Sequence, residues 1–191
     1  MQLFKQLYPA FAITIVLTVL LGIIYPVIIT GIAQLIFPRQ AAGSLIERDG
    51  RVIGSSLIGQ PFSRRGYFHS RPSAAGNGYD ATASGGTNLG PTNQKLFESV
   101  KSAADSLREE NAQSLVPIDL VTSSASGLDP DITPAAAEFQ VPRVAKERGL
   151  NENELRRFVL EHIEGRQFGF LGEPRVNVLS LNLALDQLTG K

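Results

Sequence analysis

Residues 10–37 read AFAITIVLTVLLGIIYPVIITGIAQLIF, an apolar stretch without a single charge that decides how this chain is built. At about 1.5 Å of rise per residue, a helix of this length reaches roughly 42 Å and exceeds the ~30 Å hydrocarbon core of a bilayer. The nearest charges on either side are Lys5 and Arg39. The stretch therefore predicts one transmembrane helix, running from about Tyr8 to Phe37.

A cleaved signal peptide is the alternative for such an amino-terminal stretch. The apolar region of a signal peptide spans only about 7–15 residues and is followed by a small-residue cleavage site. The run here is about twice that length. Residues 40–43, Gln-Ala-Ala-Gly, offer a small residue before a cut but carry Gln two positions further back. A retained membrane anchor is the better interpretation.

Small and hydrogen-bonding residues recur at every fourth position of this helix. Residues four apart lie on one face, and membrane helices associate through such small or polar residues. The row predicts a packing seam for partner helices, formed by Ala10, Thr14, Thr18, Gly22, Pro26, Thr30 and Gln34. The alternative is that the threonines bond to carbonyls of their own helix.

The geometry of that row argues for more than one partner. Each step of four residues turns about 40° beyond a full turn, so a single straight helix would cover only part of the seam. Pro26 removes a backbone hydrogen bond in the middle of the span and predicts a bend near Tyr25–Pro26.

Residues 39–191 are numerous enough for one soluble domain with its own core. The chain has 18 basic and 18 acidic residues and no cysteine, which excludes disulfides, thiolate zinc sites and cysteine nucleophiles. No basic block indicates nucleic-acid binding. The pattern predicts an α+β domain, with a strand pair near 51–58, strands at 116–122 and 175–178, and helices that are capped by Thr92 or Asn93, by Thr133 and by Asn151. Residues 179–188 fit a final helix, and their alternating leucines fit a strand almost as well.

The segment 73–93 is rich in glycine and alanine and carries one charge, Asp80. Compact domains rarely keep about 20 residues without regular structure unless the segment serves a function. Its backbone amides are of a kind that cradles phosphate, yet no Gly-Lys-Ser/Thr follows. A shaped surface that docks on another protein is therefore favoured over a nucleotide site.

Other candidate chemistry is weak. His69 and His162 are too few for a histidine metal site, and Asp129 and Asp131 flank a proline as turn and cap residues do, so we expect no metal site. Residues 123–127, Ser-Ser-Ala-Ser-Gly, lack the spacing of a serine nucleophile. We interpret them as a tight turn whose hydroxyls bond the backbone.

Several longer motifs are more specific. They are YFHSRPS (67–73), YDATASGGTNLGP (79–91), VPIDLVT (116–122), SASGLDP (124–130), QVPRVA (140–145) and VNVLSLNLALD (176–186). In this order, and behind one amino-terminal anchor, the chain resembles the C subunit of Kdp-type potassium-transporting P-type ATPases over nearly its whole length.

The resemblance implies an accessory subunit of a bacterial inner-membrane complex. Its partners would be a channel-like potassium-binding subunit, a P-type ATPase subunit that hydrolyses ATP, and a very small membrane subunit. The C subunit is non-catalytic, is needed for assembly and activity, and is described as a catalytic chaperone that raises the ATP affinity of the pump subunit. ATP and K+ would be used by the complex, with no cofactor on this chain. The Asp-Lys-Thr-Gly motif of a P-type ATPase is absent here.

The side of the membrane is less clear from the residues. Lys5 and the amino terminus stand against Arg39, Arg48 and Arg51, a count that slightly favours a cytoplasmic domain. The family architecture instead implies an outer location, which we expect here. Any effect on ATP affinity would then be allosteric, and nucleotide-binding residues remain unassigned.

We expect the glycine-rich loop to dock on the channel-like subunit. Its candidate contact residues are Tyr79, Asp80, Ser84, Gly85, Gly86, Asn88 and Asn93. The rival hypothesis is an anchored periplasmic hydrolase that uses Ser126 with Asp129 or His69. A stand-alone nucleotide-binding protein is a third.

Overall fold

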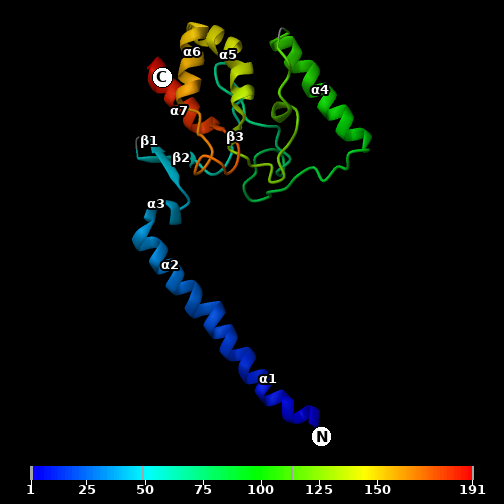
Figure 1. Cartoon of the computed structure of the whole chain (residues 1–191), viewed down its shortest axis with the longest axis vertical. Coiled ribbons are helices and arrows are strands. Elements are labelled where there is room, and N and C mark those ends of the chain that lie inside the picture. The colour runs from blue at the N-terminus through cyan, green and yellow to red at the C-terminus, as the bar shows by residue number, and fades with distance from the viewer. Residues whose placement is uncertain (1, 49, 113, 191) are drawn as a thin grey trace. The chain divides into compact units, whose positions relative to one another are not determined.

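The computed structural model describes residues 2–48, 50–112 and 114–190. The chain divides into two compact units, Met1–Leu45 and Ile46–Lys191 (Figure 1). The first holds the apolar helix and the second is an α+β domain, as the sequence predicts.

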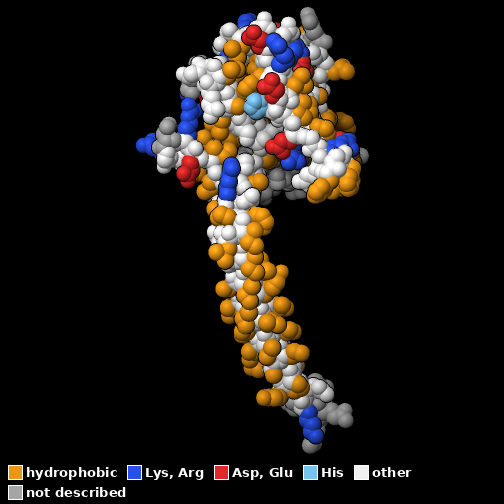
Figure 2. Space-filling view, turned by 60° about the vertical axis from the view of Figure 1, so that its left-hand side comes forward, with side chains coloured by type: hydrophobic (Ala, Val, Ile, Leu, Met, Phe, Trp, Pro, Cys, Tyr) orange, Lys and Arg blue, Asp and Glu red, His pale blue; other side chains and the backbone are white. Residues whose placement is uncertain are grey.

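The apolar unit is helical almost throughout. Helix α1 (Gln2–Val19) continues through a π-helical turn, η1 (Leu20–Ile24), into α2 (Tyr25–Ile36), and the short α3 (Pro38–Ala41) follows. Hydrophobic side chains cover the visible face of the long helix (Figure 2). The helix begins at Gln2, earlier than the start predicted near Tyr8, and thus includes residues 2–7, which carry the charge of Lys5.

Where the sequence predicts a bend near Tyr25–Pro26, the structure has the π turn η1 just before Pro26. The amide of Tyr25 donates to the carbonyl of Leu20, five residues back. Proline has no amide to donate and its ring clashes with the carbonyl four residues earlier. The wider turn accommodates this conflict without ending the helix.

The soluble unit begins with β1 (Leu45–Arg48) and β2 (Arg51–Ser55), which form a two-stranded sheet. The strand pair predicted at 51–58 is confirmed only in part: residues 51–55 form β2, and residues 56–58 lie outside any strand. The partner of β2 precedes Gly50, whose φ of +73° suits a tight turn between the two strands.

Three helices surround the core of the soluble unit. They are α5 (Pro134–Arg148), α6 (Glu152–Glu161) and α7 (Val178–Thr189). The sequence predicted two of their caps: the side chains of Thr133 and Asn151 accept amide hydrogen bonds at the starts of α5 and α6. The cap of α7, Asn177, was not predicted.

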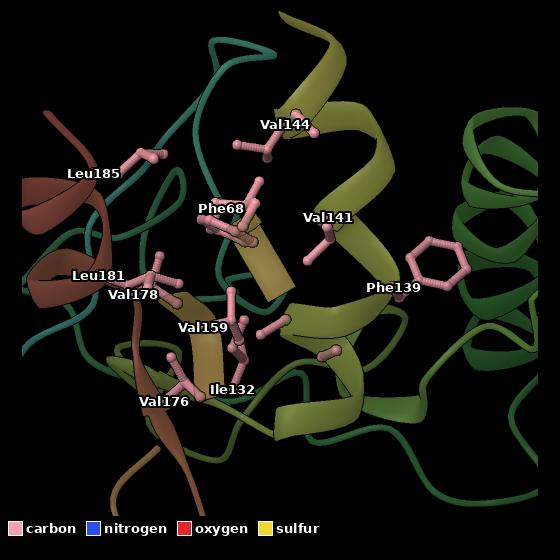
Figure 3. Packing of buried hydrophobic residues seen from close by; sticks show 14 of the residues in the cluster. Phe68, Ile132, Phe139, Val141, Val144, Val159, Val176, Val178, Leu181 and Leu185 are labelled. Carbon is pink, nitrogen blue, oxygen red and sulfur yellow. The ribbon is translucent and has the colours of Figure 1, made fainter. Parts of the chain in front are cut away.

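A second small sheet closes this core. Strands β3 (Asp131–Ile132) and β4 (Val176–Asn177) pair antiparallel, with Ile132 opposite Val176. Valines and leucines from α5, α6 and α7 gather around Phe68, which is fully buried (Figure 3).

The segment around Phe68 is extended but lies in no sheet. Asn182 of α7 supplies what a neighbouring strand would: its side chain accepts from the Phe68 amide and donates to the Phe68 carbonyl, both at 2.9 Å. Gln140 of α5 does the same for His69, at 2.7 and 3.0 Å. Carboxamides carry both a donor and an acceptor, so each matches one residue's backbone.

Two arginines satisfy the carbonyls just before Phe68. Arg143 donates to the carbonyls of Arg65 and Tyr67, and Arg148 donates to that of Gly66 at 2.7 Å. Buried backbone groups are costly when they lack partners. Side chains of α5 and α7 therefore fix the path of an otherwise unpaired segment.

Helix α4 (Gln94–Glu110) stands apart from the other helices of the soluble unit (Figure 1). Of the two caps that the sequence predicted as alternatives, Thr92 and Asn93, it is Asn93 that caps the helix by accepting from the Lys95 amide. The strand predicted at 116–122 is wrong: the structure has a 3-10 turn, η2 (Ile118–Leu120), there. Pro117 has no amide to donate to a ladder, which favours a turn at this place.

We predict that Asn182→Ala in the full-length chain destabilises the soluble unit by roughly 3 kcal/mol. The buried amide and carbonyl of Phe68 would both lose their partner, at about 1–3 kcal/mol each. Chemical denaturation in detergent, followed by circular dichroism, measures the change. Ser180→Ala, at an exposed position of the same helix, is the control; equal stability of the two variants would contradict this role of Asn182.

Candidate functional site

The glycine-rich loop is irregular over 73–93, as predicted, and one hydroxyl organises its first part. Ser73 Oγ donates to the carbonyl of Gly127 at 2.6 Å. The same oxygen accepts from the amides of Ala75 and Tyr79 at 3.2 and 2.7 Å. Ser73 thus joins the loop to the turn at 123–127.

A second pair of contacts holds the middle of the loop on the same turn. The amide of Gly85 and the hydroxyl of Ser84 both donate to the carbonyl of Ser126, each at 2.9 Å. Gly127 has a φ of +66°, and a Cβ there would lie 2.6 Å from the Ala75 nitrogen and 2.7 Å from the Gly85 oxygen. Only glycine allows this approach.

The one charge of the loop is exposed. Asp80 Oδ1 accepts from the amide and the hydroxyl of Thr82, at 2.9 and 2.7 Å. These hydrogen bonds favour the ionised form and hold the pKa of Asp80 below its ordinary value. The loop therefore presents a fixed carboxylate to solvent.

Tyr79 lies differently from the other candidate contact residues. It is half-buried with a φ of +57°, and its hydroxyl donates to the carbonyl of Arg71. Burial raises the pKa of this phenol. Ser84 and Asn88 are exposed, whereas Gly85 and Gly86 are half-buried. Tyr79 therefore supports the loop from inside, a direction that the sequence did not indicate.

Beside Tyr79, a cavity of about 370 Å³ lies between α4 and α5. It is lined by His69 and Arg143 among others, with Glu110 at its rim. Nε of Arg143 lies 3.0 Å from Glu110 Oε2, an ion pair without the alignment of a hydrogen bond. This contact and a hydrogen bond from Asn111 to the Phe139 carbonyl hold the end of α4.

The hydrolase hypothesis finds no assembled site. Ser126 Oγ accepts from the Leu128 amide, and His69 Nε2 lies 3.1 Å from the carbonyl of Arg64. Asp129 pairs with Arg71 at 3.2 Å. Each of the three groups thus has a structural partner of its own. Of the hydroxyls in the turn at 123–127, that of Ser126 bonds the backbone as predicted, and that of Ser124 lies 3.4 Å from the Ser126 hydroxyl.

The two carboxylates that flank Pro130 are also engaged. Asp131 lies 3.0 Å from Arg175 and accepts from Asn177, while Asp129 bonds Arg71 and the Asp131 amide. Within residues 2–48, 50–112 and 114–190, no cluster of three or more His, Cys, Asp or Glu side chains has the arrangement of a metal site.

The seam of the apolar helix passes through the π turn. Ala10, Thr14 and Thr18 belong to α1, Gly22 to η1, and the rest to α2. Thr14 Oγ1 donates to the carbonyl of Ala10 at 2.8 Å, so this threonine bonds its own helix, in line with the alternative interpretation of the row.

The π turn also changes how the row winds. Over its six steps of four, an uninterrupted α-helix would turn the row through about 240°. One extra residue in the π turn takes back about 100°. The row then spans roughly 140° of the helix surface, which narrows the sector that partner helices must cover.

These features define a class of protein: a domain held by one membrane helix, with a braced surface loop and no assembled catalytic group in the described part of the chain. One helix of the described residues, Lys5–Ile36, is long and apolar enough to cross a membrane.

Comparisons identify the family. The model of the family described as "KdpC: K+-transporting ATPase, c chain" matches residues 7–187. The chain belongs to this family, and it is the non-catalytic C subunit of the Kdp potassium-transporting ATPase complex. The resemblance drawn from the motifs is thereby confirmed.

Curated relatives agree over their full length. A potassium-transporting ATPase KdpC subunit of Koribacter versatilis is 60% identical over 182 residues, 95% of this chain and 94% of the relative. That of Acidobacterium capsulatum is 61% identical over 184 residues, covering 96% and 99%. That of Rhodopseudomonas palustris strain BisB18 is 56% identical over 194 residues, covering 95% and 98%.

We predict that His69 makes stability depend on pH. Burial and then the Arg143 charge lower its pKa in the folded state, only partly offset by the Arg64 carbonyl and Glu110. The unfolded chain therefore binds the proton more readily, and stability is lost as pH falls below about 6.5.

Replacement of His69 by Gln should flatten this loss between about pH 7 and 5. Denaturant titrations of the full chain at several pH values measure it. His162 is present in both proteins, so the difference between the two profiles reports position 69 alone. Identical profiles would contradict the assignment.

Proposed function

We propose that this C subunit acts as a docking and regulatory element of the complex, with residues 1–38 as tail and anchor and 39–191 as the soluble domain. The observation that carries the proposal is the braced loop. Two sets of hydrogen bonds fix residues 73–85 on the turn at 123–127. A preformed loop loses little conformational freedom on binding.

The proposed target of the loop is the channel-like potassium-binding subunit. The outer parts, Asp80, Ser84 and Asn88, are exposed, and Asp80 offers an ionised carboxylate. Asn93 has a different task because it caps α4. The contact surface then consists of a few polar groups at fixed positions, which favours specificity.

The proposed effect on ATP is allosteric. With the soluble domain on the outer face, where ATP is not available, the subunit raises the ATP affinity of the pump subunit by preferring one of its conformations. One sequence feature argues against an outer location of the domain. Lys and Arg are commoner on the cytoplasmic side of a membrane helix, and the domain side here has Arg39, Arg48 and Arg51.

The anchor is proposed to carry this coupling through its seam. A Cβ added at Gly22 or at Gly31 would meet no atom of the chain within 4 Å, so both positions leave room for a close neighbour. Only Gly22 belongs to the row of small residues. The very small membrane subunit and the membrane helices of the two larger subunits are the proposed neighbours.

We predict that deleting residues 82–87 abolishes stable assembly and potassium uptake. The deletion removes both contacts to the Ser126 carbonyl together with the exposed middle of the loop. Copurification of the complex and growth at low potassium measure the effect. Gly90→Ala, in open space with an ordinary φ, is the control and should behave like the wild type.

Circular dichroism and denaturation of the deletion variant in detergent separate docking from folding. A folded variant that no longer assembles supports the proposal. Intact assembly and transport after the deletion would overturn it.

We predict that Gly22→Leu weakens assembly and that Gly31→Leu does so much less. Helix contacts in membranes are worth about 0.6–2 kcal/mol, so roughly a threefold or larger loss of copurified complex is expected for Gly22→Leu. Equal losses for the two variants would show that the row has no special part in packing.

A further inference from the structure

Residues 164–175 form a hairpin that takes no part in the proposed docking of the loop or in the proposed packing of the anchor. It connects α6 to β4, and Glu164 and Arg175 exchange backbone hydrogen bonds of 2.8 and 3.0 Å at its base. Gln167 and Leu171 exchange two more, both 2.9 Å, at its far end. Residues 168–170 make the closing loop.

The end of this hairpin is apolar and exposed. Phe168 is 87% exposed, Phe170 69% and Leu171 47%. We call residues 168–171 the aromatic tip. Water contact at three large apolar side chains in one short turn is unfavourable, and exposed apolar groups gathered in this way mark interaction sites.

Phe168 carries a second cost. Its φ is +53°, a left-handed conformation that bulky residues rarely adopt. Asn, Asp or Gly would fit this position better. Gly169, which follows with a φ of +82°, is suited to it. A strained and exposed phenylalanine points to a role outside the folded domain.

The stem below the tip is stiff and electrically balanced. Arg166 pairs with Glu173 at 2.5 Å and Arg175 with Glu164 at 2.8 Å. Arg175 also lies 3.0 Å from Asp131 in β3. Because each of these charges has an opposite neighbour, the stem can approach an apolar environment with less desolvation cost than isolated charges would bring.

The hairpin lies at the end of the soluble unit where the chain enters from the anchor. The side chain of Asn177, at the end of β4, donates to the carbonyl of Ser56, just after β2. Figure 1 shows the orange 164–175 segment at the same end of this unit as β1 and β2.

The segment between the anchor and the soluble unit is short. Ten peptide links join Ile36, the last residue of α2, to Ile46, the first of the soluble unit. At about 3.3–3.6 Å per residue they span at most roughly 35 Å. Such a tether gives the tip a high effective concentration at the membrane surface.

We propose that the aromatic tip dips into the lipid–water interface of the membrane that holds the anchor. The area that three side chains can bury is much smaller than the ~800 Å² that each partner buries in a stable protein interface. They suffice for a tethered contact with lipid, because apolar side chains such as Phe and Leu enter the boundary between headgroups and acyl chains. The tip can make this contact on either side of the membrane, because the tether is the same length on both.

Because this chain has no tryptophan, the fluorescence of a single introduced tryptophan reports its own position alone. Phe168→Trp places a single reporter at the tip of the full-length chain, reconstituted in nanodiscs with lipids brominated near the headgroup. Phe97→Trp, at an exposed position of α4, is the matched control. We expect bromolipid quenching and a blue-shifted emission for Phe168→Trp, and solvent-like emission without quenching for the control.

A second pair of variants guards against misfolding. Phe170→Trp reports the tip, with or without Phe168→Asn, a change that suits the positive φ and preserves the turn. We expect bromolipid quenching of Phe170→Trp to fall when Phe168→Asn is added. Quenching that is unchanged would overturn the role of Phe168.

Two other outcomes of the quenching experiments would overturn the proposal. A tip tryptophan that stays open to aqueous iodide and is not quenched by bromolipid overturns the proposal. A blue-shifted tryptophan that neither quencher reaches overturns it in favour of a protein contact, such as a second copy of this chain.

Discussion

Backbone hydrogen bonds supplied by side chains hold the soluble domain together. The segment around Phe68 crosses the core without a strand partner, and two carboxamides, Asn182 and Gln140, take the place of a ladder. The arrangement ties α5 to α7 through a third piece of chain. Loss of either carboxamide would be costly, because each one satisfies a backbone donor and a backbone acceptor at once.

The loop proposed to dock depends on this constraint through a short series of contacts. Directly after the held segment, Arg71 lies 3.2 Å from Asp129 and reaches the Thr122 and Ser123 carbonyls. Two residues later Ser73 bonds Gly127. The core segment therefore sets where the 73–93 loop begins and where its supporting turn lies. A loop so fixed suits a subunit that contributes contacts rather than chemistry.

Much of this architecture could be predicted from the sequence because local signals carry it. The apolar run predicts the anchor, and Asn93, Thr133 and Asn151 predict helix starts that the structure confirms. The irregular loop and its one charge were also visible. The path of Phe68 was not, because its partners lie 71 to 114 residues away in sequence. The η2 turn was missed since VPIDLVT has the composition of a strand. The inward direction of Tyr79 depends on the carbonyl of Arg71, which belongs to a segment of irregular backbone that carries no periodic signal.

We propose that this subunit acts from the outer face and influences ATP binding without touching ATP. The most direct measurement is the side of the membrane on which the soluble domain lies. The chain has no cysteine, so Ser102→Cys, at an exposed position of α4, provides one reactive thiol for a membrane-impermeant maleimide in intact spheroplasts. Labelling before lysis is the result this account predicts. Labelling only after lysis, at a thiol shown to react in broken membranes, would contradict it and reopen direct contact with the nucleotide.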